Sequence, residues 1–369
     1  DFSKNLNSNF IDNYMNGYID FYSSGENTLS NTNNLRTTIS NDLNYFSNDL
    51  ISNFGIKNNL NLYLKNLNSV AKNDEIYTSD VQIDGKSILV YNTSFPLSKS
   101  KNMHNETLTP KISFRINPGN NMNDHTDSSS IITTSNAFDV NRLGIGNDFE
   151  SGKSITIGLD YKFDLIENEK FTDAIYEDED IKDKYLEFKL ATVIRDEFEA
   201  NIPRTSTINR KNSNLFGSIN NHLFDNINFS YEFSLDNDFK TIDSNAISTE
   251  ISVNNFVTTF NYLEQRNDLG SAHTLSNVTE YSLNDKYSFK FATARNKEIN
   301  LTEYYDLSFE YKNDCLTAAL KFNKTFYQDQ DLVPTEDLFL SITLIPLTTY
   351  EREIYKKTPG AMGLRGWFR

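Results

Sequence analysis

The side chains that most often perform chemistry in proteins are few and scattered in this sequence. Four histidines and one cysteine lie far apart, at positions His104, His125, His222, His273 and Cys315. No spacing among them matches a metal site, and the sequence contains neither His-Glu-x-x-His nor Gly-x-Ser-x-Gly. We therefore predict no catalytic residues, no metal site and no cofactor, so an enzyme is not expected.

Two polar segments match ligand-binding motifs only in part. Gly146 and the sequence Gly152-Lys153-Ser154 imitate a phosphate-binding loop, but five residues separate the glycines where that loop has four. The residues that follow alternate as in a strand, so we interpret Gly152 as the start of a strand. Residues 176–180 (Tyr-Glu-Asp-Glu-Asp) could supply oxygen ligands to Ca²⁺, but they lack the glycine of an EF-hand turn, and a solvated loop is favoured.

Composition limits the class of protein. The chain has 369 residues with 35 Lys+Arg against 51 Asp+Glu, a net charge of −16 that argues against nucleic acid as a partner. Apolar residues make up only 37% of the chain and mean hydropathy is −0.56, yet aromatic residues reach 13%. Disordered chains are poor in aromatic residues. A polar chain rich in Phe and Tyr must place its apolar groups in register, which indicates β structure.

Strict alternation of apolar and polar residues runs through the sequence. In 155–163, for example, Ile, Ile, Leu, Tyr and Phe alternate with Thr, Gly, Asp and Lys. Such a strand separates two environments. The same pattern predicts strands at 35–45, 54–64, 108–116, 186–194, 215–223, 227–235, 287–293, 305–311, 316–326 and 338–344.

The connections between these strands differ in length at their two ends. Short polar turns recur every 29 or 30 residues, at 225–226, 254–255, 284–285 and 313–314. Longer polar connections separate them, at 237–244, 265–275, 296–303 and 327–337. Tight turns at one end and long loops at the other are typical of an outer-membrane barrel, whose strands of about 10 residues cross the membrane at a tilt. We predict an all-β, antiparallel transmembrane β-barrel with about fifteen strands or more and no helical domain.

Two points stay open at this stage. A soluble β-sandwich or β-helix also has alternating strands, although no linker divides the chain into several cores. The acidic segment 176–180 falls on the short-turn side, so it is either an insertion or a sign of an unrecognised strand pair. No apolar run is long enough to form a transmembrane helix, and Asp1 begins the chain without an apolar signal segment, as expected for a mature or excised piece.

Several segments resemble, in order, the barrel of the LPS-assembly outer-membrane protein family, LptD, also called the organic-solvent-tolerance family. The most specific is the Tyr-x-Asn-Asp-Cys turn formed by Tyr311, Asn313, Asp314 and Cys315. The similarity runs from about residue 85 to 347. The other matching segments are Thr-Pro-Lys within 108–113, Asn136 to Arg142, the stretch from Gly146 to Gly152 that includes Glu150, and residues 326–331.

The resemblance implies a barrel of about 26 strands, more than this chain holds. It therefore predicts that residues 1–349 are the C-terminal part of an outer-membrane barrel and that 350–369 are a periplasmic tail. In the family, a cysteine at this turn forms a disulfide with the N-terminal region, which implies the same role for Cys315 with a partner outside this chain. Strand parity places that turn on the short-turn side, in an oxidising periplasm. The family often has two adjacent cysteines, and Asp314 stands in place of the first.

The family's function implies partners and a path for them. Lipopolysaccharide (LPS) would pass its sugars through the polar lumen while its acyl chains leave through a lateral seam between the first and last strands into outer-membrane lipid. The resemblance also implies an outer-membrane lipoprotein (LptE-like) plugging the lumen and a periplasmic LPS bridge acting through the absent N-terminal domain. The last predicted strand supplies the gate-strand candidates Phe339, Ser341, Thr343, Ile345 and Pro346, the last because a proline cannot donate to the ladder.

Three other functions remain as alternatives. A general diffusion channel would share the periodicity but not the Asn-Asp-Cys turn, and it would raise the conductance of small solutes. An outer-membrane protease or phospholipase would need clustered His, Asp or Ser, which the sequence does not suggest. A soluble acidic adhesin would stay in the aqueous phase without detergent. The net charge of −16 is also not what simple attraction to anionic LPS would select.

Overall fold

Twenty antiparallel strands make up the computed structural model, which describes residues 2–6, 17–30, 33–74, 77–119, 130–144, 150–166, 184–326, 334–345 and 348–357. The first ten are β1 (Phe2–Leu6), β2 (Gly17–Ser30), β3 (Asn34–Ser47), β4 (Leu50–Ile51), β5 (Lys57–Lys72), β6 (Gln82–Ser94), β7 (Leu97–Lys101), β8 (His104–Asn117), β9 (Gly152–Leu165) and β10 (Lys184–Arg195). The others are β11 (Leu215–Phe224), β12 (Ile227–Leu235), β13 (Ile242–Val253), β14 (Phe256–Gln265), β15 (His273–Asn284), β16 (Tyr287–Asn296), β17 (Leu301–Lys312), β18 (Leu316–Thr325), β19 (Glu336–Leu344) and β20 (Thr348–Lys357).

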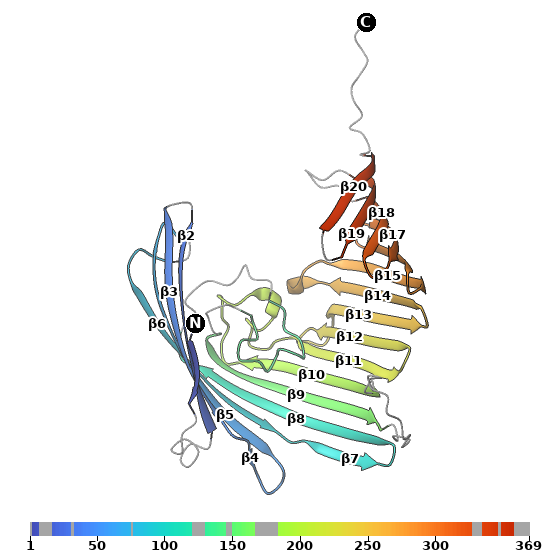
Figure 1. The fold of residues 1–369 in the computed structure, drawn as a ribbon. Coiled ribbons are helices and arrows are strands. Elements are labelled where there is room, and N and C mark those ends of the chain that lie inside the picture. The colour runs from blue at the N-terminus through green and yellow to red at the C-terminus, as the bar shows by residue number, and fades with distance from the viewer. Residues whose placement is uncertain are drawn as a thin grey trace. The chain divides into compact units, whose positions relative to one another are not determined.

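The only helices in the described part of the chain are two single 3₁₀ turns, η2 (Arg204–Ser206) and η3 (Asn267–Leu269). The fold is therefore all-β, as the alternation predicted. In the second half of the chain, Figure 1 shows β13, β14 and β15 following one another in chain order. Within the described residues, no helix has the length and apolar character needed to span a membrane.

Tight turns are confirmed at all four predicted positions, whereas the connection predicted at 296–303 is shorter than expected and most of the one predicted at 327–337 lies outside the described residues. Two-residue turns join β11 to β12, β13 to β14 and β15 to β16, and the turn after β17 has three residues. At the turn after β13, Val253 pairs with Phe256, and Asn254 has a φ of 50°. Asparagine tolerates this left-handed conformation, which tight hairpins require. The intervening connections span 236–241, 266–272, 297–300 and 326–335.

The chain divides into two compact units. The first comprises Asp1–Ile166, Glu187–Ser218 and Ser234–Thr241, and the second comprises Glu167–Leu186, Ile219–Phe233 and Ile242–Arg369. The first unit contains the long connections after β8 and β10. The second contains the regular hairpins from β13 to β20.

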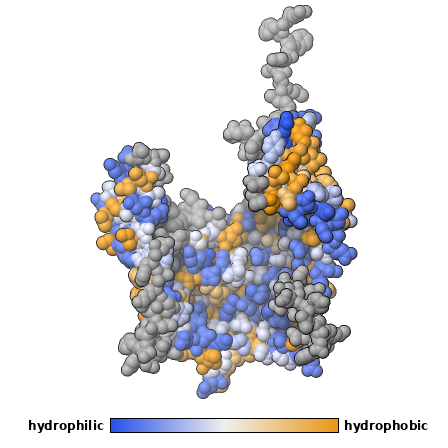
Figure 2. Space-filling view, viewed as in Figure 1, coloured by the Kyte–Doolittle hydropathy of each residue, from blue (hydrophilic) through white to orange (hydrophobic). Residues whose placement is uncertain are grey.

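In the first unit, the two faces of the sheet have the reverse of the usual distribution. Phe114 is 41% exposed, whereas its neighbour Arg115 is only 6% exposed. The same alternation continues on β9, where Ile155 and Ile157 are exposed and Ser154 is buried. Figure 2 shows mainly hydrophilic residues over β8 and β9 on the face toward the viewer. The strands thus cover their polar side chains and present their apolar ones outward, as a sheet surrounded by hydrocarbon does.

A small apolar core lies where loops pack on the polar face of this unit. Segments 130–144 and 196–214 contribute residues to it, together with β10 and β11, and Figure 1 shows these loops against the strands. The core consists of Ile132, Ala137, Leu143, Ala191, Val193, Ile202, Ile208 and Phe216, with Phe138 at its edge. The loops are therefore anchored to the sheet by packing as well as by polar contacts.

The predicted last strand, 338–347, required a correction. Its core is β19, but the chain continues into β20, which pairs with β19 from Leu344–Thr348 to Glu336–Lys357. Residues 350–357 are thus a strand, where a tail was expected. Their sequence (Tyr-Glu-Arg-Glu-Ile-Tyr-Lys-Lys) is too charged to show the alternation, and the preceding proline suggested a stop. Because β20 runs back from the tight-turn end, Lys357 lies at the long-loop end of this unit.

Other sequence predictions meet the structure only in part. Gly152 begins β9, which confirms the strand start in place of a phosphate loop. The acidic segment 176–180, His125, Gly146 and Pro346 lie outside the described residues, as does 358–369. Within the described residues, no group of three or more His, Cys, Asp or Glu side chains has the geometry of a metal site.

Candidate functional site

The Asn-Asp-Cys turn between β17 and β18 is built around the side chain of Asn313. Its Oδ1 accepts hydrogen bonds from the backbone N–H of Cys315 at 3.0 Å and of Leu316 at 2.8 Å. Its Nδ2 donates to the hydroxyl of Tyr311 at 3.2 Å. An asparagine that bonds the backbone two and three residues ahead stabilises a tight turn. Asp314 and Cys315 are exposed at its tip, and Cys315 is a free thiol in this chain.

Three of the gate-strand candidates lie on β19, and a fourth, Ile345, follows it directly. The registers place Phe339 opposite Lys321, Ser341 opposite Ala319 and Thr343 opposite Thr317, so these three share one face of β19. The Thr343 hydroxyl is 3.1 Å from the Thr349 hydroxyl on β20. Ile345 follows the strand, and its N–H donates to the Cys315 carbonyl at 2.9 Å. The Asn-Asp-Cys turn and the end of β19 are therefore neighbours, although nothing in the sequence predicted this contact.

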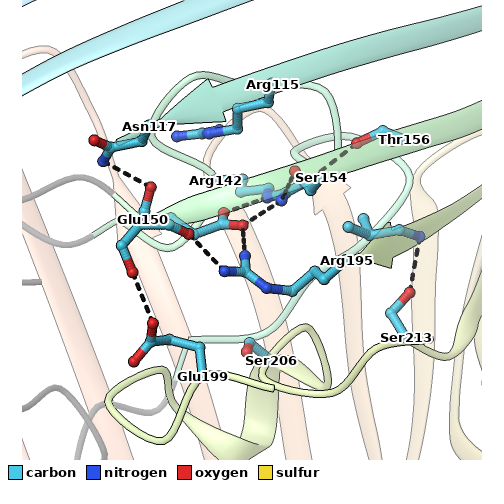
Figure 3. Close-up of polar contacts among 12 residues, drawn as sticks. Arg115, Asn117, Arg142, Glu150, Ser154, Thr156, Arg195, Glu199, Ser206 and Ser213 are labelled. Atoms are coloured by element: carbon cyan, nitrogen blue, oxygen red, sulfur yellow. Dashed lines mark hydrogen bonds and ion pairs between the residues drawn. The ribbon is translucent and has the colours of Figure 1, made fainter. Parts of the chain in front are cut away.

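A second polar constellation, not predicted as such, lies on the polar face of the first unit (Figure 3). Arg142 and Glu150 form a buried ion pair with two hydrogen bonds, Nε to Oε2 at 2.6 Å and Nη2 to Oε1 at 2.5 Å. Arg142 also donates to the hydroxyls of Ser154 and Thr156 on β9, each at 3.0 Å. These contacts fasten the loop after β8 to the strand that follows it.

Two further arginines complete this arginine–glutamate cluster. Arg195, the last residue of β10, donates from Nη1 to the same Oε1 of Glu150 and from Nη2 to the Ser151 carbonyl at 2.5 Å. Arg115 on β8 donates to the carbonyls of Asp139 and Val140. Three guanidinium groups therefore surround one carboxylate, a local charge of 3 − 1 = +2 in a buried setting.

The electrostatics of Glu150 follow from this arrangement. Burial alone would raise the pKa of its carboxyl, but the charges of Arg142 and Arg115, the hydrogen bond from Arg142 and the charge of Arg195 together outweigh burial. The pKa falls from 4.5 to about 2. Glu150 is therefore an anion at any physiological pH, and the cluster is a permanent clamp between β8, β9, β10 and the loop.

A glycine allows the same loop to lie close to β9. A Cβ atom at Gly158 would stand 2.7 Å from the ring of Phe138 and 3.0 Å from the Leu190 carbonyl. Lys111 places its Nζ 4.3 Å from the centroid of that ring, in cation–π geometry. The loop is thus fixed by an aromatic contact at one end and by the charged clamp at the other.

Sequence reasoning found only half of this cluster. Arg142 and Glu150 fall within the two segments that carry the family resemblance, although no pairing between them was predicted. Arg115 and Arg195 looked like ordinary polar positions of alternating strands. The sequence did place Arg115 and Arg195 at polar positions of two strands, where they would be covered. Only the packing of those strands shows that both arginines face the carboxylate of Glu150.

Comparison with known protein families decides the identity of the chain. The model of the family "LPS transport system D" (LptD) matches residues 58–292, which is more than half of the 369 residues. The chain belongs to the LptD family. The match includes Arg115, Arg142, Glu150 and Arg195, whereas the Asn-Asp-Cys turn lies beyond its end.

Two solved structures of outer-membrane receptors show a distant similarity. They are two mutants of the ferric enterobactin receptor of Pseudomonas aeruginosa in complex with enterobactin, each 10% identical, with TM-scores of 0.37 and 0.36. Each match covers 89% of this chain and 60% of the receptor, so this chain spans less than two thirds of the receptor's length. No curated protein matches the sequence.

The LptD family is a family of LPS transport, and membership of it agrees with an all-β chain of the outer membrane. This setting accounts for the reversed faces of the sheet. The outward apolar residues, such as Phe114, face lipid, and the covered polar residues face the interior. The arginine–glutamate cluster then holds its loop on the interior side.

Proposed function

We propose that this chain is part of a translocon that inserts LPS into the outer leaflet of the outer membrane. Membership of the LptD family carries this proposal. The two-faced sheet supports it, because an amphiphile needs a polar path for its sugars and lipid contact for its acyl chains. No covalent bond changes in such a step, so the chain needs binding and opening, and no catalytic group.

The lateral seam belongs to this proposal, with a change of strand. β20 follows β19 and is the last described strand, so we propose β20 as one lip of the seam, with Phe339, Ser341 and Thr343 behind it on β19 and Ile345 in the turn after β19. Pro346 remains a gate candidate on the sequence alone. All ten residues of β20 are exposed. The β19–β20 ladder also shifts register at Leu338 and Phe339, a local weakness suited to a strand that must move.

The turn after β17 supports an attachment to the rest of the protein. Cys315 is exposed on a hydrogen-bonded turn, and a cysteine that bonds to a separate domain must be exposed. We propose that Cys315 forms a disulfide with a cysteine in a domain outside this chain. The periplasmic LPS bridge would deliver LPS through that domain. The tight-turn end is then periplasmic, and a lipoprotein plug occupies the interior.

Photocrosslinking in cells tests the proposed function. A photoreactive residue would be placed at Tyr350 on β20 and, separately, at Phe339 in the full-length protein. We expect LPS adducts from these positions and none from Asn267, which lies in a loop after β14. A folded protein in the outer membrane that gives no LPS adduct at Tyr350 or Phe339, and that conducts small solutes when reconstituted, would favour a general diffusion channel.

A further inference from the structure

A row of side chains crosses five neighbouring strands of the second unit on one face. The registers place Lys290 on β16 opposite Ser308 on β17, and Ser308 opposite Lys321 on β18. Lys321 is opposite Phe339 on β19, which is opposite Glu353 on β20. Adjacent strands lie about 4.8 Å apart, so the two lysines start about 10 Å apart and can reach one ligand.

This row borders a cavity of about 370 Å³. Both lysines line it, together with Asp306, Ser308, Asn323 and Phe339. The size is within the range of small-molecule sites. The face is the interior one, because Leu307 and Phe309, which alternate with Asp306 and Ser308 on β17, are among the exposed apolar residues.

The polar groups of the cavity are incompletely paired within the protein. Lys321 forms no ion pair with any residue that the structure describes, whereas Lys290 is 2.5 Å from Glu280 in a half-exposed pair. The Oδ1 atom of Asp306 is buried and has no hydrogen-bond partner in the described part of the chain. A buried carboxylate oxygen without a donor is costly, and a bound ligand with hydroxyl groups would satisfy it.

We propose that this cavity binds a phosphorylated sugar. The two lysines would hold the phosphate, with Asn323 and Ser308 as further donors. The carboxylate of Asp306 would accept from sugar hydroxyls, and the ring of Phe339 offers an apolar surface for the C–H face of a pyranose. The inference rests on the proposed function and deepens it, since the headgroup of LPS is a phosphorylated saccharide and the cavity lies beside β19 and β20.

The mixed charge of the cavity favours this ligand class over a simple anion. Two cations stand beside the carboxylates of Asp306 and Glu351, so a bare phosphate would meet repulsion as well as attraction. A phosphorylated sugar carries an anion and several hydroxyl donors at different positions of one molecule. It therefore matches both kinds of group at once.

Titration calorimetry on the folded protein in detergent tests this proposal, with glucosamine 6-phosphate as the probe. We expect Lys321→Gln to weaken binding roughly tenfold or more, since a charge-assisted hydrogen bond is lost. Lys321→Arg should retain most of the affinity. The matched control is Lys286→Gln, because Lys286 is an exposed lysine at the tight turn after β15, and it should leave binding unchanged.

Two comparisons separate the parts of the proposal. Phe339→Leu should weaken glucosamine 6-phosphate but leave inorganic phosphate unaffected. Binding that is equal for inorganic phosphate and the sugar phosphate, or equal in Lys321→Gln and Lys286→Gln, would overturn the inference. Neither of these results would touch the photocrosslinking at Tyr350, so failure of this site and failure of the translocon are distinguishable.

Discussion

Replacing Glu150 with glutamine should release the loop after β8 from the sheet. Glutamine keeps the size of the side chain but removes the single negative charge among three buried guanidinium groups. Glu150 accepts two hydrogen bonds from Arg142 and one from Arg195, and its own exposed fraction is only 4%. Breaking a buried ion pair by removing one partner costs about 3–5 kcal/mol, because the remaining charges stay desolvated.

The cost should appear as local opening, since the strands of the sheet keep their own hydrogen bonds. Hydrogen exchange of the protein in detergent measures it directly. The amide of Ala137, which donates to Thr133, and that of Gly144, which donates to Asn141, report on the loop. A loss of 3–5 kcal/mol of local stability corresponds to exchange that is faster by roughly 10²- to 10³-fold or more, up to the unprotected rate.

A matched substitution distinguishes the clamp from a general effect of charge removal. Glu197→Gln alters an exposed glutamate in the neighbouring loop and should change exchange by less than about 0.5 kcal/mol. Equal protection of Ala137 and Gly144 in Glu150→Gln and Glu197→Gln would refute the claim that the cluster holds the loop. A further variant with Glu150, Arg115, Arg142 and Arg195 all replaced by methionine should recover part of the loss, because no buried charge of the cluster is left unpaired.

Three further outcomes are expected. Because the pKa of Glu150 is depressed in the fold, its contribution is fully present above the unfolded value near 4.5 and is lost as pH falls toward about 2; protease protection of the loop should therefore persist at pH 5 and disappear in that acidic range. Gly158→Ala should lower the free energy of unfolding by about 1–3 kcal/mol and so lower the midpoint in urea, whereas Gly85→Ala, where a Cβ meets nothing within 4 Å, should not; equal midpoints would contradict the close packing of the loop. Asn313→Ala removes the acceptor of two turn amides and should cost about 1–3 kcal/mol, seen as faster exchange of both; unchanged exchange would mean that the turn is held by other contacts.

The strands and tight turns could be predicted from sequence because their signals are local. Alternation in 155–163 needs no knowledge of the rest of the chain, and the asparagines at 254–255 specify a turn by their own conformational preference. β20 was missed for the same reason. Its exposed strand contains Glu351, Arg352 and Glu353 in succession, and partnership with β19, not alternation, defines it.

The candidate sites depend on which residues become neighbours across strands, and this cannot be predicted from the sequence alone. Arg115 and Arg195 are 80 positions apart, and only the packing of β8, β9 and β10 brings both to Glu150. The cavity beside Lys321 likewise arises from four registers, in which a shift by one residue would send the lysine to the opposite face. Alternation shows which residues share a face of one strand, but it does not show which residues become neighbours across strands.

The reversed faces of the sheet also determine when this protein becomes hydrophobic. Along the chain, each apolar residue such as Phe114 or Ile155 is flanked by polar ones, so an extended polypeptide offers water a mixed and mostly hydrophilic ribbon. Only pairing into a sheet brings the alternate apolar side chains together in one continuous hydrophobic surface. The unfolded chain is therefore compatible with water. It gains affinity for the bilayer only when its strands pair, so membrane insertion is coupled to strand pairing.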